Sequence, residues 1–221
     1  DTAGAGENTR DSVSNYIHTF LGLDTSKAQE LPEPPALPVR PPVLCAGCPH
    51  RASFYAVKTA MKGKKTIFCG DIGCYTLGAN APFNAINSCV DMGASITMAK
   101  GAADGGLFPA VAVIGDSTFT HSGMTGLLDC VNENANVTIV ISDNETTAMT
   151  GGQDSAGTGR IEAICAGLGV EPAHIRVVVP LKKNYEEMKQ IIREEIEYRG
   201  VSVIIPRREC IQTLARKKRS K

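Results

Sequence analysis

The chain has 221 residues, of which 43% are apolar and 21% charged, typical of a globular protein long enough to bury a core. The 23 Lys and Arg residues balance 23 Asp and Glu residues, which excludes a globally basic nucleic-acid-binding protein. No apolar run approaches the ~18 residues that a membrane span needs, and no signal-peptide pattern opens the chain. Eight cysteines without such a signal predict a cytoplasmic protein with reduced thiols that serve metals or chemistry.

The two ends of the chain differ from its middle. Residues 1–42 predict a polar tail and a Pro-rich linker, because seven of the twelve prolines lie between Pro32 and Pro49 and such a stretch is extended. We expect the compact domain over residues 43–206. Residues 207–221 carry seven Lys or Arg and one Glu, which predicts a basic solvated tail or linker, with a docking patch for an acidic partner as the alternative. The chain begins without Met, so we expect a fragment or a separately encoded part of an enzyme.

Within residues 43–206, short β-branched runs alternate with helical patterns. Strands are predicted at 66–69, 110–114, 137–142, 175–179 and 201–205, and helices at about 51–62, 93–104, 122–134, 160–168 and 184–199. Continuous apolar strands are buried on both faces, so the alternation predicts an α/β fold with a doubly wound, mostly parallel sheet and helices on both faces. Ligands of such sheets bind at the carboxyl ends of the strands.

Two consecutive predicted strands end in oxygen-bearing side chains. Asp116 follows the strand at 110–114, and Asn144 follows the strand at 137–142. Both would lie at one edge of the sheet, where a carboxylate and an amide oxygen suit Mg²⁺ shared with phosphates. Backbone amides at a helix start near Ser122 could take phosphate oxygens. Taken singly, Asp116 could merely cap a helix and Asn144 merely turn the chain, but the pair favours a metal–diphosphate site.

Five motifs in chain order then carry a resemblance. They are Cys45–His50 (CAGCPH), Gly70–Tyr75 (GDIGCY), Met92–Ser95 (MGAS), Gly115–Thr118 (GDST) and Asp143–Gly152 (DNETTAMTGG). Over about residues 40–210 the chain resembles the 2-oxoacid:ferredoxin oxidoreductases, and most of all the thiamine diphosphate-binding domain of the indolepyruvate ferredoxin oxidoreductase alpha subunits. The resemblance implies a thiamine diphosphate-binding fold. Ser117 stands where many relatives have a second glycine.

The resemblance also implies a set of cofactor-binding residues. Mg²⁺ would be held by Asp116, Asn144 and the backbone carbonyl of Thr146. The expected thiamine diphosphate site comprises Asp71, Ile72, Gly73, Cys74, Met92, Gly93, Ala94, Ser95, Gly115, Asp116, Ser117, Thr118, Asn144, Thr146, Ala148 and Met149. Met92–Ser95 would lie against the aminopyrimidine, although a tight strand–helix turn would need Gly93 in any case.

Four cysteines are candidates for a second metal site. Cys45 and Cys48 form a Cys-x-x-Cys pair, Cys74 lies in a Gly-containing loop, and Cys210 follows the last strand. Four thiolates suit either zinc or a [4Fe–4S] cluster, and spacing does not choose between them. The resemblance implies the cluster. The remaining four, Cys69, Cys89, Cys130 and Cys165, are expected to be small core residues.

Two histidines are candidate catalytic residues. His50 follows Cys48-Pro49 and either faces a substrate or is an ordinary helix N-terminal residue, and His121 follows the Gly115–Thr118 motif, from which it could approach the cofactor. The reaction that the resemblance implies is oxidative decarboxylation of a 2-oxoacid such as indolepyruvate, with coenzyme A taking the acyl group and ferredoxin the electrons.

The implied partners lie outside this chain. A pyrimidine-binding domain would supply the activating Glu, and a beta subunit would complete an oligomeric enzyme with no nucleic-acid or membrane partner. We expect an interface around residues 71–75, 91–95 and 146–152, with dimerisation or disorder at 146–159 in the isolated chain. The rival functions are a non-oxidative thiamine diphosphate-dependent 2-oxoacid decarboxylase, which needs no clustered cysteines, and a non-catalytic metal-binding module, which leaves Asp116 and Asn144 without a role.

Overall fold

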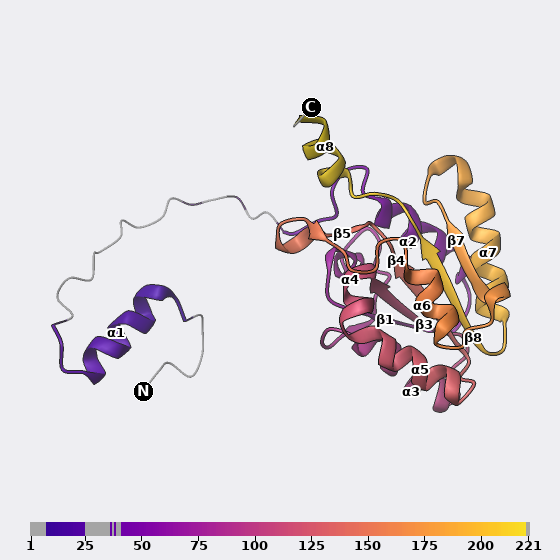
Figure 1. The fold of residues 1–221 in the computed structure, drawn as a ribbon, viewed down its shortest axis with the longest axis horizontal. Helices are drawn as coiled ribbons and strands as arrows, with labels where there is room; N and C mark the ends of the chain where they lie inside the picture. Colours follow the sequence, from indigo (N-terminus) through magenta and orange to yellow (C-terminus); the bar gives the residue numbers. More distant parts are fainter. Residues whose placement is uncertain (1–7, 25–35, 37, 39–40, 220–221) are drawn as a thin grey trace. The chain divides into compact units, whose positions relative to one another are not determined.

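The computed structural model describes residues 8–24, 36, 38 and 41–219, which divide into two compact units, residues 1–41 and 42–221 (Figure 1). The described part of the first unit is the helix α1 (Arg10–Phe20), where the sequence predicts no element. Thr9 caps its N-terminus, because the Thr9 hydroxyl oxygen accepts a hydrogen bond from the Ser12 amide at 3.2 Å. Most of the predicted Pro-rich linker lies outside the described residues.

The second unit is built on one parallel six-stranded sheet. Its strand order is β2-β1-β3-β4-β8-β7, with β1 at Ile67–Gly70, β2 at Ser88–Cys89, β3 at Ala110–Gly115, β4 at Val137–Ser142, β7 at Ile175–Val178 and β8 at Val201–Pro206. Every residue of β3, β4 and β8 is buried, as the apolar runs predict. The predicted doubly wound α/β fold is confirmed.

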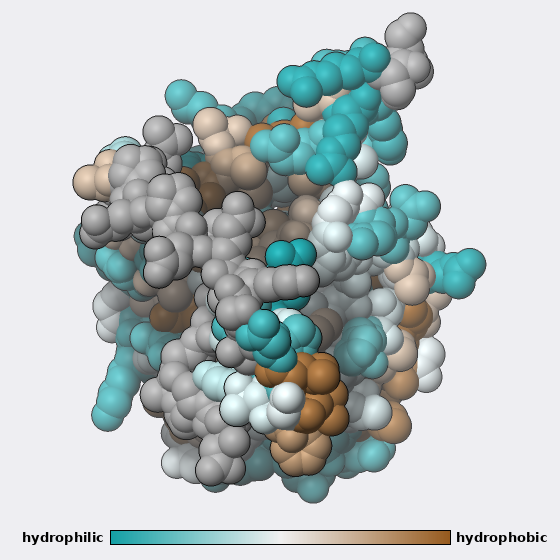
Figure 2. Space-filling model, turned by 90° about the vertical axis from the view of Figure 1, so that its left-hand side faces the viewer, coloured by the Kyte–Doolittle hydropathy of each residue, from teal (hydrophilic) through white to brown (hydrophobic). Residues whose placement is uncertain are grey.

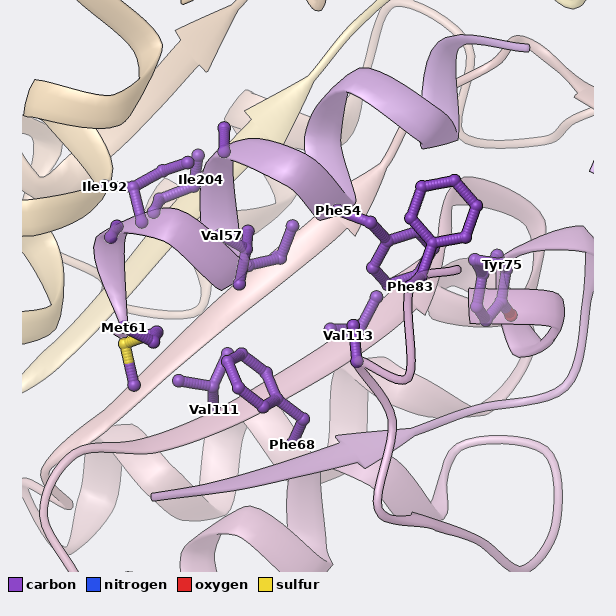
Figure 3. Packing of buried hydrophobic residues seen from close by; sticks show 14 of the residues in the cluster. Phe54, Val57, Met61, Phe68, Tyr75, Phe83, Val111, Val113, Ile192 and Ile204 are labelled. Atoms are coloured by element: carbon purple, nitrogen blue, oxygen red, sulfur yellow. The ribbon is translucent and has the colours of Figure 1, made fainter. Parts of the chain in front are cut away.

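Helices cover both faces of this sheet (Figure 1). The helices α2 (Pro49–Ala60) and α7 (Tyr185–Glu197) pack on one face, and α3 (Ala94–Asp104), α5 (Met124–Asn132) and α6 (Ile161–Gly167) on the other. Side chains along β3 alternate between the two, since Val111 and Val113 face α2 while Ile114 faces α3 and α5. Figure 3 shows Phe54 and Val57 of α2 over Val111 and Val113.

The second unit also contains elements that the sequence pattern does not reveal. The segments β5 (Thr146–Thr147) and β6 (Gln153–Asp154) form a short antiparallel hairpin, and a 3₁₀ turn covers Cys74–Ala79. The helix α8 (Ile211–Arg219) forms where the sequence predicts a solvated tail. Its hydrophilic surface stands at the top of Figure 2. The helix predicted at 122–134 begins already at Asp116, because α4 (Asp116–Thr118) and a π-helical turn (Phe119–Gly123) lead into α5.

Among the residues that the structure describes, no helix combines the length and the apolar character that a membrane span requires.

Candidate functional site

A pocket of about 180 Å³ opens at the carboxyl edge of the sheet, where β1, β3 and β4 end. Its walls come from five segments that are distant in sequence. Its lining residues are His50, Ile72, Gly73, Cys74, Tyr75, Met92, Gly115, Asp116, Ser117, Thr118, Ser142, Asn144, Thr146, Thr147, Ala148, Met149 and Thr150. The predicted convergence of Asp116 and Asn144 is therefore present, because both line the same cavity.

Asp116 brings a buried negative charge to this cavity. It lies between the end of β3 and the start of α4 and is only 2% exposed. Burial raises the pKa of its carboxyl to about 6. Its Oδ2 and the hydroxyl of Ser95 are the buried side-chain oxygens that lack a hydrogen-bond partner among the described residues. An unpartnered carboxylate oxygen on a pocket wall is what a cation would satisfy, so the donor set fits Mg²⁺.

Asn144 lies two residues beyond the end of β4, and Asp116 lies one residue beyond the end of the neighbouring strand β3. Its Oδ1 accepts a hydrogen bond from the Thr146 amide at 3.4 Å, and its Nδ2 lies 3.4 Å from Nε2 of His50. Thr146 is 4% exposed, and its hydroxyl donates to the Gln153 carbonyl across the β5–β6 hairpin at 2.8 Å. The hairpin thereby holds Thr146, the third predicted Mg²⁺-binding residue, next to Asn144.

Tyr75 is a pocket residue that sequence reasoning missed. Its ring is buried against two glycines, and a Cβ on Gly73 or Gly115 would lie 2.4 or 2.3 Å from it. Its hydroxyl lies 2.7 Å from the Ile72 carbonyl and 2.9 Å from the Thr118 hydroxyl. The glycines beside Cys74 and Asp116 were the available signal, because paired glycines indicate close approach of something bulky. Ser142, Thr147 and Thr150 were also missed.

Asp71 supports the pocket from outside. It is fully buried, and its carboxylate accepts hydrogen bonds from the amides of Ile72 at 2.9 Å, Gly93 at 2.8 Å and Ser95 at 3.1 Å. These bonds tie the end of β1 to the start of α3. Of the predicted Met92–Ser95 segment, only Met92 is a pocket-lining residue. Gly93, Ala94, Ser95 and the predicted Asp71 do not line the pocket.

The two candidate histidines differ in placement. His50 lies in the first turn of α2 and is 3% exposed on the pocket wall, with its ring edge-to-face against Tyr75. Burial lowers the pKa of the His50 ring to about 4. His121 is exposed on the π-helical turn and is not a pocket-lining residue.

A second pocket, of about 190 Å³, contains all four predicted ligand cysteines. Cys45 and Cys48 come from the turn before α2, Cys74 from the loop after β1, and Cys210 from the start of α8. The side-chain amide of Gln212 lies 3.5 Å from the Cys45 sulfur, a contact that sequence reasoning missed. No three His, Cys, Asp or Glu side chains within residues 8–24, 36, 38 and 41–219 converge as a single-ion site. The cysteines surround a cavity instead.

In this second pocket, burial and the neighbouring cysteines disfavour the deprotonated form of the Cys48 and Cys74 thiols in the absence of a cation. Burial raises the pKa of Cys48 to about 11, and the neighbouring cysteines add to the rise. Burial likewise raises the pKa of Cys74, with Cys210 and Cys45 contributing. A positively charged group in the cavity would reverse this balance. Of the other cysteines, Cys69, Cys130 and Cys165 are buried as predicted, but Cys89 is exposed because the edge strand β2 carries it.

The two pockets share a wall. His50, Cys74, Asn144 and Ala148 line both cavities. The backbone amide of Cys210 also donates to the carbonyl of Asn144 at 3.1 Å. A residue of the oxygen-lined pocket is thus bonded directly to a residue of the cysteine-lined pocket.

An ion-pair network of Arg207, Asp143 and Glu162 fixes the chain directly after β4. Nε of Arg207 lies 2.6 Å from Oδ2 of Asp143, whose side chain is fully buried. The same guanidinium binds both carboxylate oxygens of Glu162 on α6, at 2.8 and 2.6 Å. Because Asp143 precedes Asn144 directly, this network anchors the backbone that presents Asn144 to the pocket.

Comparison with curated proteins shows close relatives that are longer than this chain. The chain is 41% identical over 194 residues to the indolepyruvate oxidoreductase subunit IorA of Archaeoglobus fulgidus, covering 82% of this chain and 30% of that protein. It is 39% identical over 222 residues to the IorA subunit of Methanothermobacter marburgensis, covering 93% of this chain and 35% of that protein. The chain thus spans about a third of the length of these curated relatives.

Solved structures support the fold. The 2-oxoglutarate:ferredoxin oxidoreductase of Magnetococcus marinus superposes with a TM-score of 0.64 at 18% identity, over 77% of this chain and 65% of that chain. The 4-hydroxybenzoylformate decarboxylase of Rhodococcus jostii superposes with a TM-score of 0.55 at 17% identity, over 94% of this chain and 41% of that chain. Residues 71–205 match the family model of the thiamine pyrophosphate enzyme, C-terminal TPP binding domain. The chain therefore belongs to the thiamine pyrophosphate enzymes and contains their C-terminal cofactor-binding domain.

Proposed function

We propose that this chain is the thiamine diphosphate- and Mg²⁺-binding part of a 2-oxoacid:ferredoxin oxidoreductase that acts on aryl pyruvates such as indolepyruvate. The products would be an acyl-coenzyme A, CO₂ and reduced ferredoxin. The relatives named for indolepyruvate support the substrate, and the Magnetococcus marinus structure, which has 2-oxoglutarate, coenzyme A and succinyl-CoA bound, supports coenzyme A as acceptor.

The observation that carries the proposal is the shared wall between an oxygen-lined pocket and a cysteine-lined pocket. Asp116 and Asn144, with the Thr146 carbonyl, would hold Mg²⁺ in the first. Cys45, Cys48, Cys74 and Cys210 would hold a [4Fe–4S] cluster in the second. Four cysteines around one cavity supply the thiolates that a [4Fe–4S] cluster needs.

The chain's own residues would bind and orient. Thiamine diphosphate, when bound, supplies the carbanion chemistry of 2-oxoacid decarboxylation. Asp116 and Asn144 would neutralise and fix the diphosphate through the metal. Tyr75 and the two glycines beside it shape the pocket wall, and the buried ring of His50 forms part of the wall between the two pockets.

The rim of the pocket supports an interface. Ile72, Met92 and Met149 are 41%, 43% and 63% exposed around its mouth, which leaves apolar area for a partner. We infer that a pyrimidine-binding domain covers this rim and supplies the activating Glu, and that a beta subunit and ferredoxin complete the enzyme.

The test uses the assembled enzyme, purified without oxygen. We expect 2-oxoacid- and coenzyme A-dependent reduction of ferredoxin, faster with aryl pyruvates than with aliphatic 2-oxoacids. Cys210→Ser should lose iron and ferredoxin reduction, whereas the matched control Cys165→Ser, on the buried face of α6, should keep both. Release of free aldehyde by an iron-free enzyme would instead establish the non-oxidative decarboxylase.

A further inference from the structure

His50 occupies an unusual position for a buried histidine. It lines both pockets, is 3% exposed, and has one side-chain partner in hydrogen-bond range, Nδ2 of Asn144 at 3.4 Å. The start of α2 sets its backbone position, because Cys48 is the N-cap residue, Pro49 occupies the first helical position and His50 follows.

The direction of this hydrogen bond follows from the chemistry of the amide. The NH₂ group of an asparagine can only donate, so Nε2 of His50 must accept and the ring proton lies on Nδ1. At the other end of the amide, the Thr146 backbone N–H donates to Oδ1 at 3.4 Å. If the Asn144 amide were reversed, its NH₂ group would face the Thr146 backbone N–H, and two hydrogen-bond donors would oppose each other. The Thr146 amide thus sets the orientation of Asn144, and a His50 ring that carries its proton on Nδ1 is complementary to it.

We propose that His50 is a positioning residue, which holds the NH₂ end of Asn144 so that the amide oxygen is the end presented to the metal in the cofactor pocket. This role rests on the proposed Mg²⁺ site. Mg²⁺ coordinates the amide oxygen of an asparagine and not its nitrogen. An Asn144 amide without hydrogen-bond partners would therefore spend part of its time with the nitrogen toward the metal. His50 acts through Asn144 and not on a substrate.

The same contact links the metal site to the cysteine pocket. His50 is two residues from Cys48, and the Cys210 amide donates to the Asn144 carbonyl at 3.1 Å. The side chain and the backbone of Asn144 are therefore both held by segments that also carry cysteines. Residues that hydrogen-bond to a metal ligand contribute to metal affinity because they restrict that ligand to its bound geometry.

The experiment compares His50→Gln and His50→Asn in the assembled enzyme. The end of a glutamine lies near the position of Nε2, and the end of an asparagine near that of Nδ1, so Gln can still accept from Asn144 and Asn cannot. Val57→Ala, buried on the same helix but facing the sheet, is the control for general loosening of α2. Mg²⁺ is titrated at fixed thiamine diphosphate, and cofactor binding is followed by calorimetry.

We expect His50→Asn to raise the Mg²⁺ midpoint about 10- to 100-fold, the range for loss of an outer partner of a metal ligand. His50→Gln and Val57→Ala should stay near the wild type. Equal midpoints for the Gln and Asn variants, or an equal shift in Val57→Ala, would overturn the proposal.

A measurement without variants covers the case in which the substituted proteins do not fold. Nitrogen-15 NMR of histidine-labelled wild type should show the Nδ1–H tautomer for His50, and an Nε2–H tautomer would overturn the proposal. If the folded wild type shows no Mg²⁺-dependent thiamine diphosphate binding, the proposed function itself fails, and the positioning role falls with it. A failure confined to the His50 comparison leaves the proposed function standing.

Discussion

Replacement of Asp116 by Asn should make the metal-free protein more stable while removing its response to Mg²⁺. The carboxylate is 2% exposed, and one of its oxygens has no partner among the described residues. Burial raises its pKa from 3.8 to about 6, which corresponds to about 3 kcal/mol at 1.36 kcal/mol per pKa unit. This figure is the cost of keeping the group ionised at neutral pH without a cation, and an uncharged side chain of the same shape avoids it.

The gain from Asp116→Asn should be smaller than that upper limit, about 1–2 kcal/mol, because Asn loses part of the hydrogen bonding from Ser117. Urea denaturation at pH 7.5 of chelator-treated protein measures it, with an unchanged denaturant slope as the check on two-state behaviour. Mg²⁺ with thiamine diphosphate should then stabilise the wild type, by about 2.7 kcal/mol at a hundredfold excess over the dissociation constant, and leave Asp116→Asn unchanged. A variant that is less stable than metal-free wild type, or equally stabilised by Mg²⁺, would refute this account of the pocket.

Three further outcomes are expected. Arg207→Met should destabilise the domain by about 3–5 kcal/mol in denaturant titrations, because it leaves the carboxylate of Asp143 buried without a counter-charge, and a loss below about 1 kcal/mol would speak against this. Glu162→Gln should lower the free energy of unfolding by about 0.5–1 kcal/mol at pH 7. The hydrogen bond from Arg207 lowers the pKa of Glu162 in the folded state, so its stabilisation is present above the unfolded pKa and is lost as the pH falls through the folded pKa. A difference from wild type that persists at pH 2.5 would contradict this. Gly115→Ala should cost about 1–3 kcal/mol and weaken cofactor binding, because its Cβ would meet the ring of Tyr75 at 2.3 Å, and normal binding with normal thermal stability would show that the ring is not fixed.

The sequence predicts the sheet well because its strands are long apolar runs bounded by turn residues. Residues 110–115 and 137–142 leave no alternative to buried parallel strands, and the rule that ligands lie at the carboxyl ends then brings Asp116 and Asn144 together. The two-residue strands β2, β5 and β6 carry too few residues for any periodicity, so they escape such reasoning.

Side-chain direction is harder to predict than strand order. Asp71 looks like a ligand by type and position, yet three backbone amides occupy its carboxylate, and no pattern in the sequence reveals that. The convergence of Cys210 with the Cys-x-x-Cys pair depends on α8, whose apolar residues are too few to predict a packed helix. His121 could not be placed because a π-helical turn rotates the residues that follow Asp116.

The contacts made after β8 bear on where this domain can be cut. The stretch that matches the family model stops at residue 205, within that strand. Yet Arg207 pairs with Asp143, the Cys210 amide caps the Asn144 carbonyl, and Arg216 donates to the Gly151 carbonyl at 2.7 Å beside the pocket rim. A recombinant boundary drawn at the end of the last strand would discard all three contacts. Expression designs should therefore retain the chain through at least the second turn of α8, and a purification tag at the C-terminus should be separated from Arg216 by a spacer.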